Sequence, residues 1–281
     1  MLKLLSLGAD FKKAVDEKLA GKVVLVSRRA LLIDVNGTIF EMLSSKMPRS
    51  TISAVLSRSE LKDLPINVGD PVNFRESILL NGIELSPQNA EVWAWNLKKR
   101  YNLSKRALSK VSEKIENILS VRHPILLNEV RDPLLRATLE KIYLAFSFCK
   151  SYFEKEPNQS MQAVLDIVGL GPGLTPAGDD ALAGFLIGTY YFTPRDHPLS
   201  GFLNGLRNEI GCKTTTAYSK RLLGLAVNGI SNEYVRGLIL GIAHQNNYAL
   251  TINSKKILRL GATSGYFFLL GFMKGLEMIA L

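Results

Sequence analysis

A glycine-rich stretch from Gly169 to Asp180 has residue types and spacing that could do chemistry. It reads Gly-Leu-Gly-Pro-Gly-Leu-Thr-Pro-Ala-Gly-Asp-Asp and leads into a run of small apolar residues, 181–188. Glycines allow tight turns and close approach of the backbone to a ligand, while prolines fix φ and oppose helix formation. A stiff loop that enters a helix is typical of a binding or catalytic site. We therefore expect a substrate-binding loop, with contacts from Gly171, Gly173, Thr175 and Gly178.

Two adjacent acids, Asp179 and Asp180, end this stretch and are the catalytic candidates. In a structural interpretation, one Asp caps a helix at Gly178 and the other is solvated, since acids are favoured in a first helical turn. In a functional interpretation, one Asp faces the loop cavity and accepts hydrogen bonds from an N–H₂ group. It could also hold a Mg²⁺ that in turn holds an anion. The sequence leaves both interpretations open.

Two nucleotide-binding motifs do not fit this stretch. Residues 164–168 could form a strand before Gly169, as in a dinucleotide-binding fold, but the third glycine comes too early. No acid ends a second strand about 20 residues later. A phosphate-binding P-loop is excluded because no Gly-Lys-Ser/Thr follows.

A polar run, Lys213–Arg221, lies in the same half of the chain. Thr216 and Ser219 are three residues apart and share one helix face. Either they cap a helix over 217–228, or their hydroxyls contact the substrate. In the second case Lys213, Lys220 or Arg221 would neutralise a carboxylate or phosphate.

A weak internal repeat links this stretch with the end of the chain. Gly178-x5-Gly184-Phe185-x2-Gly188 matches Gly265-x5-Gly271-Phe272-x2-Gly275, and a threonine stands shortly before each copy. The repeat predicts two loop-to-helix starts that face one site. Asp180 corresponds by spacing to Phe267, so one half of that site is polar and the other apolar.

The motif at residues 169–180 resembles the signature of a bacterial family labelled domain of unknown function 2877, some members of which are subunits of oxamate carbamoyltransferase in anaerobic allantoin and purine breakdown. Thr216-x-x-Ser219 and Gly261-Ala262-Thr263-Ser264-Gly265 resemble two further family segments. The resemblance covers residues 160–281 well and the first 150 only by layout. It implies a carbamoyltransferase-type subunit with partner subunits and a small-molecule substrate, and it adds Thr263, Ser264 and Gly265 to the substrate-binding candidates.

The last segment departs from the family pattern at two places. Ala262 and Phe267 stand where the family usually has His and Asp. If those groups are catalytic in the family, this chain has lost them. It would then use a different substrate or serve as a non-catalytic scaffold or regulatory subunit.

Composition restricts the remaining function classes. The chain has 281 residues, 47% of them hydrophobic, and a formal charge of +10. One basic block, residues 98–110, could meet an anionic partner, but it is more typical of a solvated helix face, and no nucleic-acid-binding motif accompanies it. Two distant cysteines, Cys149 and Cys212, predict buried reduced thiols and no metal site. Apolar stretches shorter than the about 20 residues of a membrane span predict a cytoplasmic protein.

The layout predicts an α+β fold in three parts: a mainly β domain over 1–90, connecting helices over 91–160, and a helical domain over 161–281. After a short helix at 9–20, strands alternate with turn signals. Asn36-Gly37 and Asn81-Gly82 predict hairpins of a small antiparallel barrel or sandwich. From about Val92 a helical period runs to Val121, and Arg131-Asp132-Pro133 predicts the start of another helix.

Overall fold

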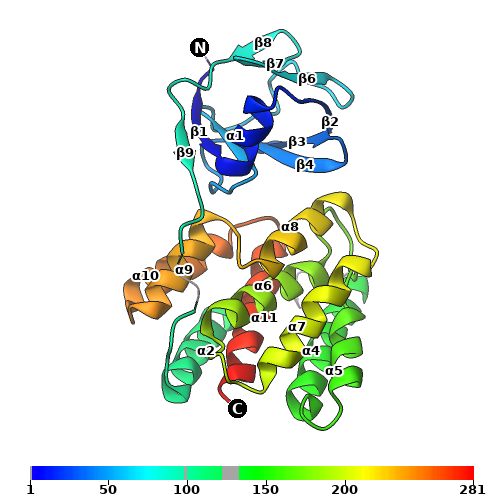
Figure 1. Ribbon diagram of the computed structural model, residues 1–281, viewed down its shortest axis with the longest axis vertical. Coiled ribbons are helices and arrows are strands. Elements are labelled where there is room, and N and C mark those ends of the chain that lie inside the picture. Colours follow the sequence, from blue (N-terminus) through cyan, green and yellow to red (C-terminus); the bar gives the residue numbers. More distant parts are fainter. Residues whose placement is uncertain (1, 98–99, 122–132) are drawn as a thin grey trace. The chain divides into compact units, whose positions relative to one another are not determined.

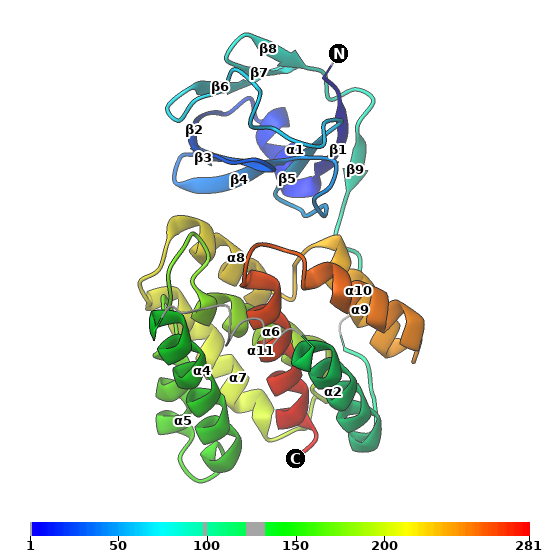
Figure 2. The ribbon, with the colours of Figure 1, turned by 180° about the vertical axis from the view of Figure 1, so that it is seen from behind.

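The computed structural model describes residues 2–97, 100–121 and 133–281, and it divides into two compact units, Met1–Asn96 and Leu97–Leu281. The first is a curled sheet with one helix, and the second is helical (Figures 1 and 2). The predicted α+β class is therefore confirmed. Lys98 and Lys99 of the basic block, and Arg131 and Asp132 of the predicted helix start, lie outside the described residues.

The first unit is a nine-stranded mixed sheet in the order β8-β7-β6-β2-β3-β4-β5-β1-β9. Most neighbours are antiparallel, but β4 with β5 and β1 with β9 are parallel. The single helix α1 packs Phe11 against Phe40 and Phe74, with ring centroids 5.5 and 5.4 Å apart. The elements are β1 (Leu4–Gly8), α1 (Ala9–Asp16), β2 (Ala20–Val26), β3 (Ala30–Val35), β4 (Thr38–Leu43), β5 (Ser53–Leu56), β6 (Pro71–Phe74), β7 (Ile78–Leu80), β8 (Ile83–Leu85) and β9 (Glu91–Trp93).

Both predicted hairpin turns are present. Asn36 and Gly37 join β3 to β4, and Asn81 and Gly82 join β7 to β8. All four residues have positive φ, which Asn and Gly tolerate best and which a type I′ turn requires. The predicted helical period from Val92 is wrong at its start, because Glu91–Trp93 pairs with β1 as a parallel strand and the helix begins only at Lys105.

The second unit is built around two helices, α6 (Ala177–Phe192) and α11 (Ser264–Ile279), whose residues are buried on nearly every side. Figures 1 and 2 show the other helices arranged around this pair. They are α2 (Lys105–Ser120), α4 (Pro133–Tyr152), α5 (Pro157–Leu165), α7 (Leu199–Glu209), α8 (Ala217–Val227), α9 (Glu233–Ala243) and α10 (Asn247–Ile257), with a 3₁₀ turn, η1, at Ile210–Cys212.

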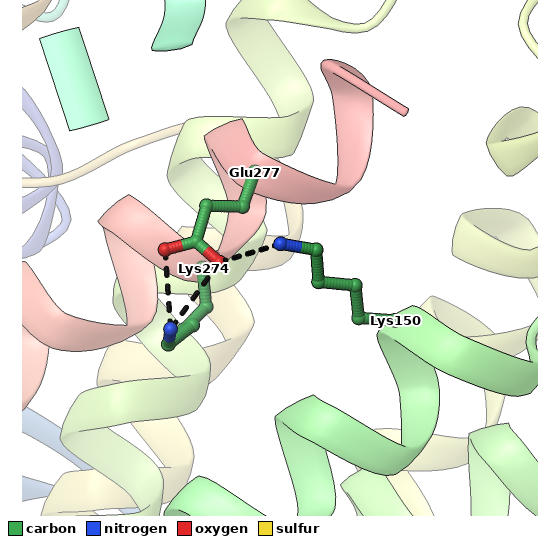
Figure 3. Close-up of polar contacts among 3 residues, drawn as sticks. All are labelled: Lys150, Lys274 and Glu277. Carbon is green, nitrogen blue, oxygen red and sulfur yellow. Dashed lines mark hydrogen bonds and ion pairs between the residues drawn. The ribbon is translucent and has the colours of Figure 1, made fainter. Parts of the chain in front are cut away.

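Polar contacts also tie the outer helices to the central pair. Glu277 of α11 accepts hydrogen bonds from Lys274 at 3.1 Å and from Lys150 of α4 at 3.1 Å (Figure 3). On α2, the basic residues Lys105, Arg106 and Lys110 are exposed. Among the described residues, no helix is long and apolar enough to cross a membrane. Of the two cysteines, Cys149 is buried as expected, whereas Cys212 lies in η1 and is exposed.

Candidate functional site

The glycine-rich stretch forms a loop between α5 and α6. The strand considered for residues 164–168 does not form, because α5 continues to Leu165 and a turn follows. Gly169, Gly171 and Gly173 have φ of +74°, +107° and +101°, a region that side-chain-bearing residues rarely adopt. A Cβ at Gly178 would lie 1.8 Å from the carbonyl oxygen of Ile167, so the helix can start here only on glycine. The glycines therefore set the course of the loop.

Asp179 holds this loop against the segment that precedes α8. Its side chain is 1% exposed and accepts hydrogen bonds from the Gly169 N–H at 2.7 Å and from the Ser219 hydroxyl at 2.6 Å. The Thr215 hydroxyl donates to it as well. Hydrogen bonds to a carboxylate are among the stronger ones in proteins, and here they occupy both oxygens. Asp179 is thus fully engaged by the chain itself.

Thr216 adds a second connection between the same two segments. Its hydroxyl donates to the Leu174 carbonyl at 2.6 Å and accepts from the Ser219 N–H at 3.0 Å, as the N-cap of α8. The capping interpretation of Thr216 is therefore observed, and Ser219 contacts Asp179. Thr215, which lies in the polar run but is not among the predicted site residues, belongs to this network. Its neighbours in sequence are threonines too, so sequence alone could not single it out.

Asp180 faces the start of α11. One of its carboxylate oxygens, Oδ2, is buried and has no hydrogen-bond partner among the described residues. Burial raises the pKa of Asp180 from 3.8 to about 7; the hydroxyls of Ser264 and Thr175 act in the opposite direction, and the charge of Asp179 adds to the rise. The structural interpretation, in which one Asp caps the helix and the other is solvated, is not observed. The N-cap of α6 is Pro176, Asp179 is buried, and Asp180 is half-buried.

The starts of α6 and α11 meet at this point. The hydroxyls of Thr175 and Ser264 are 3.0 Å apart. A Cβ at Gly265 would lie 1.9 Å from the Ile257 carbonyl oxygen, which repeats the close approach at Gly178. The positive ends of two helix dipoles therefore point to the place where Asp180 lies, and such ends favour anions and hydrogen-bond acceptors.

The segment that forms this corner matches the model of a known family. Residues 167–276 match the family model described as oxamate carbamoyltransferase subunit AllH. The resemblance noted from the motifs is thereby confirmed for this segment. The match includes the loop, Thr215–Ser219 and the start of α11, and it does not include the first unit. No solved structure matches the chain.

Within the AllH-matching segment, the structure brings some predicted site residues together and leaves others apart. Thr175, Asp180 and Ser264 meet at the helix starts, while Thr216 and Ser219 gather around Asp179 and Leu174. Lys220 is exposed on α8, and the Lys213 ammonium lies 3.7 Å from Asp166. Gly173 borders open space, Gly171 lies close to Ala177, and Thr263 occupies the N-cap position of α11.

Ala262 and Phe267, where the motif resemblance leads us to expect His and Asp, have different surroundings. Ala262 is exposed in the loop before α11, whereas Phe267 is 1% exposed and packs edge-on against Tyr266. The place that corresponds to Asp180 in the internal repeat is therefore apolar. No group of three or more His, Cys, Asp or Glu side chains that could hold a metal occurs within residues 2–97, 100–121 and 133–281.

Proposed function

We propose that this protein is a subunit of an oxamate carbamoyltransferase-related complex and that the corner at Asp180 binds a small carbamoyl or carboxylate substrate. The observation that carries the proposal concerns Oδ2 of Asp180, beside the starts of α6 and α11: it is buried and has no hydrogen-bond partner in the part of the chain that the structure describes. The family match over residues 167–276 supports it. As part of this proposal, the complex acts in the cytoplasm, in allantoin or purine catabolism.

A buried carboxyl oxygen without a partner costs free energy, roughly 1–3 kcal/mol for a polar group of this kind. A ligand that supplies N–H donors would recover that cost. A carbamoyl or amide N–H₂ fits, because a carboxylate only accepts hydrogen bonds. The oxygens of the same ligand would meet N–H groups at the helix starts and in the loop at Gly171 and Gly173.

Asp180 has a pKa suited to moving a proton at neutral pH. A group that titrates near 7 is partly ionised there and can both accept and return a proton. In carbamoyl transfer, the amide nitrogen of oxamate attacks the carbamoyl carbon of carbamoyl phosphate. The bond from that carbon to the phosphate oxygen breaks, phosphate leaves, and the proton lost by the nitrogen goes to Asp180.

Asp179, Thr216 and Ser219 have a positioning role in this proposal. They fix the loop against α8 and so hold Gly171, Gly173 and Thr175 at a constant distance from Asp180. Ser264 and Thr175 place hydroxyls beside the carboxylate and can turn toward a ligand oxygen or nitrogen.

The test is an assay for transfer between carbamoyl phosphate and oxamate, with the protein alone and co-expressed with the products of neighbouring genes. Asp180→Asn keeps the shape and removes the base, so we expect a loss of about 10²- to 10⁴-fold in kcat. Asp63→Asn, at an exposed position of the first unit, is the matched control and should leave transfer unchanged. No transfer in any combination would count against the proposal.

The apolar burial of Phe267 favours a second function, that of a non-catalytic scaffold or regulatory subunit. In that case Asp180→Asn leaves the activity of the assembled complex unchanged while the complex still forms. Size-exclusion chromatography of the co-expressed subunits, run beside the assay, separates a failure of assembly from a failure of chemistry.

A further inference from the structure

A polar hollow lies at the end of α6 remote from the Asp180 corner. It has a volume of about 200 Å³ and is lined by Arg100, Thr189, Tyr190, Thr193, Ser200, Leu203, Asn204 and Arg207. These residues come from the chain before α2, from the end of α6, and from α7. Thr193 is thirteen residues after Asp180, so at 1.5 Å per residue the hollow lies roughly 20 Å along α6 from the Asp180 corner.

Two arginines, Arg100 and Arg207, bring positive charge to this hollow. Arg100 is close enough to Arg207 for its charge to help burial lower the pKa of Arg207. Arg207 stacks its guanidinium over Tyr190, 5.4 Å from the ring centroid, and donates to the Asn204 side chain at 3.3 Å. Within the described parts of the chain, neither arginine forms an ion pair with a carboxylate. Two like charges held together in this way would be stabilised by an anion between them.

Two buried polar atoms at the hollow also lack a partner among the described residues. They are the hydroxyl oxygen of Thr193 and Nε of Arg207. Thr193 is 4% exposed, so water does not easily satisfy its hydroxyl. Thr189 differs, because its hydroxyl already donates to the Phe185 carbonyl at 2.8 Å. Buried polar groups are nearly always hydrogen-bonded, so these two atoms call for a partner, and a ligand in the hollow would supply it.

We propose that this hollow is a binding site for a small oxyanion, a phosphoryl or carboxylate group, held by Arg100, Arg207 and the hydroxyl of Thr193. An oxyanion has only acceptor oxygens, which match the donors available here. Guanidinium groups bind phosphate and carboxylate oxygens through paired N–H donors, and Arg207 has such donors left. The site is separate from the Asp180 corner and does not depend on the proposed carbamoyl transfer.

A structural alternative is that the two arginines only complement the negative end of the α6 dipole. That alternative explains why cations lie near the last turn of α6. It does not explain why the Thr193 hydroxyl lacks a partner among the residues that the structure describes, because a dipole does not satisfy a hydroxyl. The two explanations differ in one measurable respect: only a binding site gives saturable affinity that requires these side chains.

The test measures binding of inorganic phosphate and of malonate to the full-length protein by isothermal titration calorimetry at constant ionic strength. We expect saturable binding of at least one probe, and the tighter of the two tells whether the site prefers a phosphoryl or a carboxylate group. Arg207→Gln should weaken it by about 10-fold or more, as expected for a charge-assisted hydrogen bond. Arg106→Gln, which makes the same charge change at an exposed position of α2, should leave it within about 2-fold.

Two further variants keep the test decisive if Arg207→Gln does not fold. Arg100 is exposed, so Arg100→Gln is expected to fold and to weaken binding. Thr193→Val keeps the shape of the side chain and removes only the hydroxyl. Asp180→Asn should bind the probe as the unchanged protein does. Absence of saturable binding, or equal weakening by Arg106→Gln and Arg100→Gln, would overturn the proposal.

Discussion

Gly184 of α6 and Gly271 of α11 each lie against a backbone carbonyl of the other helix, which occupies the space that a side chain would need. A Cβ on Gly184 would lie 1.9 Å from the Phe268 oxygen, and a Cβ on Gly271 would lie 1.7 Å from the Ala181 oxygen. The backbones of the two central helices are therefore in direct contact. This contact keeps the helix starts together, where Thr175 meets Ser264.

Gly271→Ala should lower the free energy of unfolding by about 3 kcal/mol or more, because a methyl group has no space and the helices must separate. The measurement is urea denaturation followed by circular dichroism. Gly224→Ala is the matched control: Gly224 lies inside α8 with nothing within 4 Å of an added Cβ. That change should raise stability by up to about 1 kcal/mol through helix propensity alone. Equal effects at both positions would contradict the close contact.

Asp179→Asn should also destabilise the fold, through loss of a buried carboxylate that three donors surround. We expect about 3 kcal/mol, because the amide keeps one acceptor and brings an N–H₂ toward donors. Ser219→Ala removes a single donor and should cost about 1 kcal/mol. Thermal or urea unfolding measures both. If Asp179→Asn leaves stability unchanged yet abolishes transfer, this residue acts on the substrate and not on the loop.

Asp180 makes stability depend on pH in a defined window. Its folded-state pKa of about 7 is above its ordinary value of 3.8, so the folded protein keeps a proton that the unfolded chain releases. The contribution to stability is complete below about pH 4 and is lost as pH rises to about 7, at about 1.4 kcal/mol per unit of pKa difference.

The measurement is the free energy of unfolding at several pH values between 4 and 8. Asp180→Asn should flatten the profile in this window and make the protein more stable at pH 8, because no charge is then buried. Asp63→Asn, at an exposed site, should keep the profile of the unchanged protein. A profile that is the same in all three proteins would show that Asp180 titrates normally.

Local signals in the sequence predicted much of this fold. Asn36-Gly37 and Asn81-Gly82 indicate hairpins because their own backbone preferences suit positive φ. The glycine repeat of 178–188 and 265–275 predicted two related loop-to-helix starts, and these starts lie together at Thr175 and Ser264. The Gly-rich motif likewise led to the correct family segment.

Other features depend on contacts between distant segments. Glu91–Trp93 is a strand because β1 offers it an edge, and its local period did not indicate this. Asp179 differs from Asp180 because the hydroxyls of Thr215 and Ser219 donate hydrogen bonds to the Asp179 carboxylate. The hollow at Arg100 and Arg207 is made of three separate segments. The spacing of residues along the sequence does not indicate any of these long-range contacts.

The cluster at Glu277 predicts a modest, salt-dependent contribution to stability. Glu277 is 20% exposed and joins Lys150 to Lys274, which itself lies over the Tyr143 ring. Glu277→Gln should lower the free energy of unfolding by about 1 kcal/mol at low salt, and by less at high salt because exposed ion pairs are screened. Lys12→Gln, which breaks the exposed pair with Asp16, is the control and should cost less.

Ala262 and Phe267, where the motif resemblance leads us to expect His and Asp, should respond differently when those residues are introduced. Ala262 is exposed, so Ala262→His should change stability by less than about 0.5 kcal/mol. Phe267 is buried in apolar surroundings, so Phe267→Asp should cost about 4 kcal/mol by removing a ring and burying an acid. Urea unfolding measures both, and the transfer assay on Ala262→His shows whether the missing imidazole limits the chemistry. A stable Phe267→Asp variant would mean that the packing around α11 can accept the acid. The core would then not explain why Phe, and not Asp, stands at position 267.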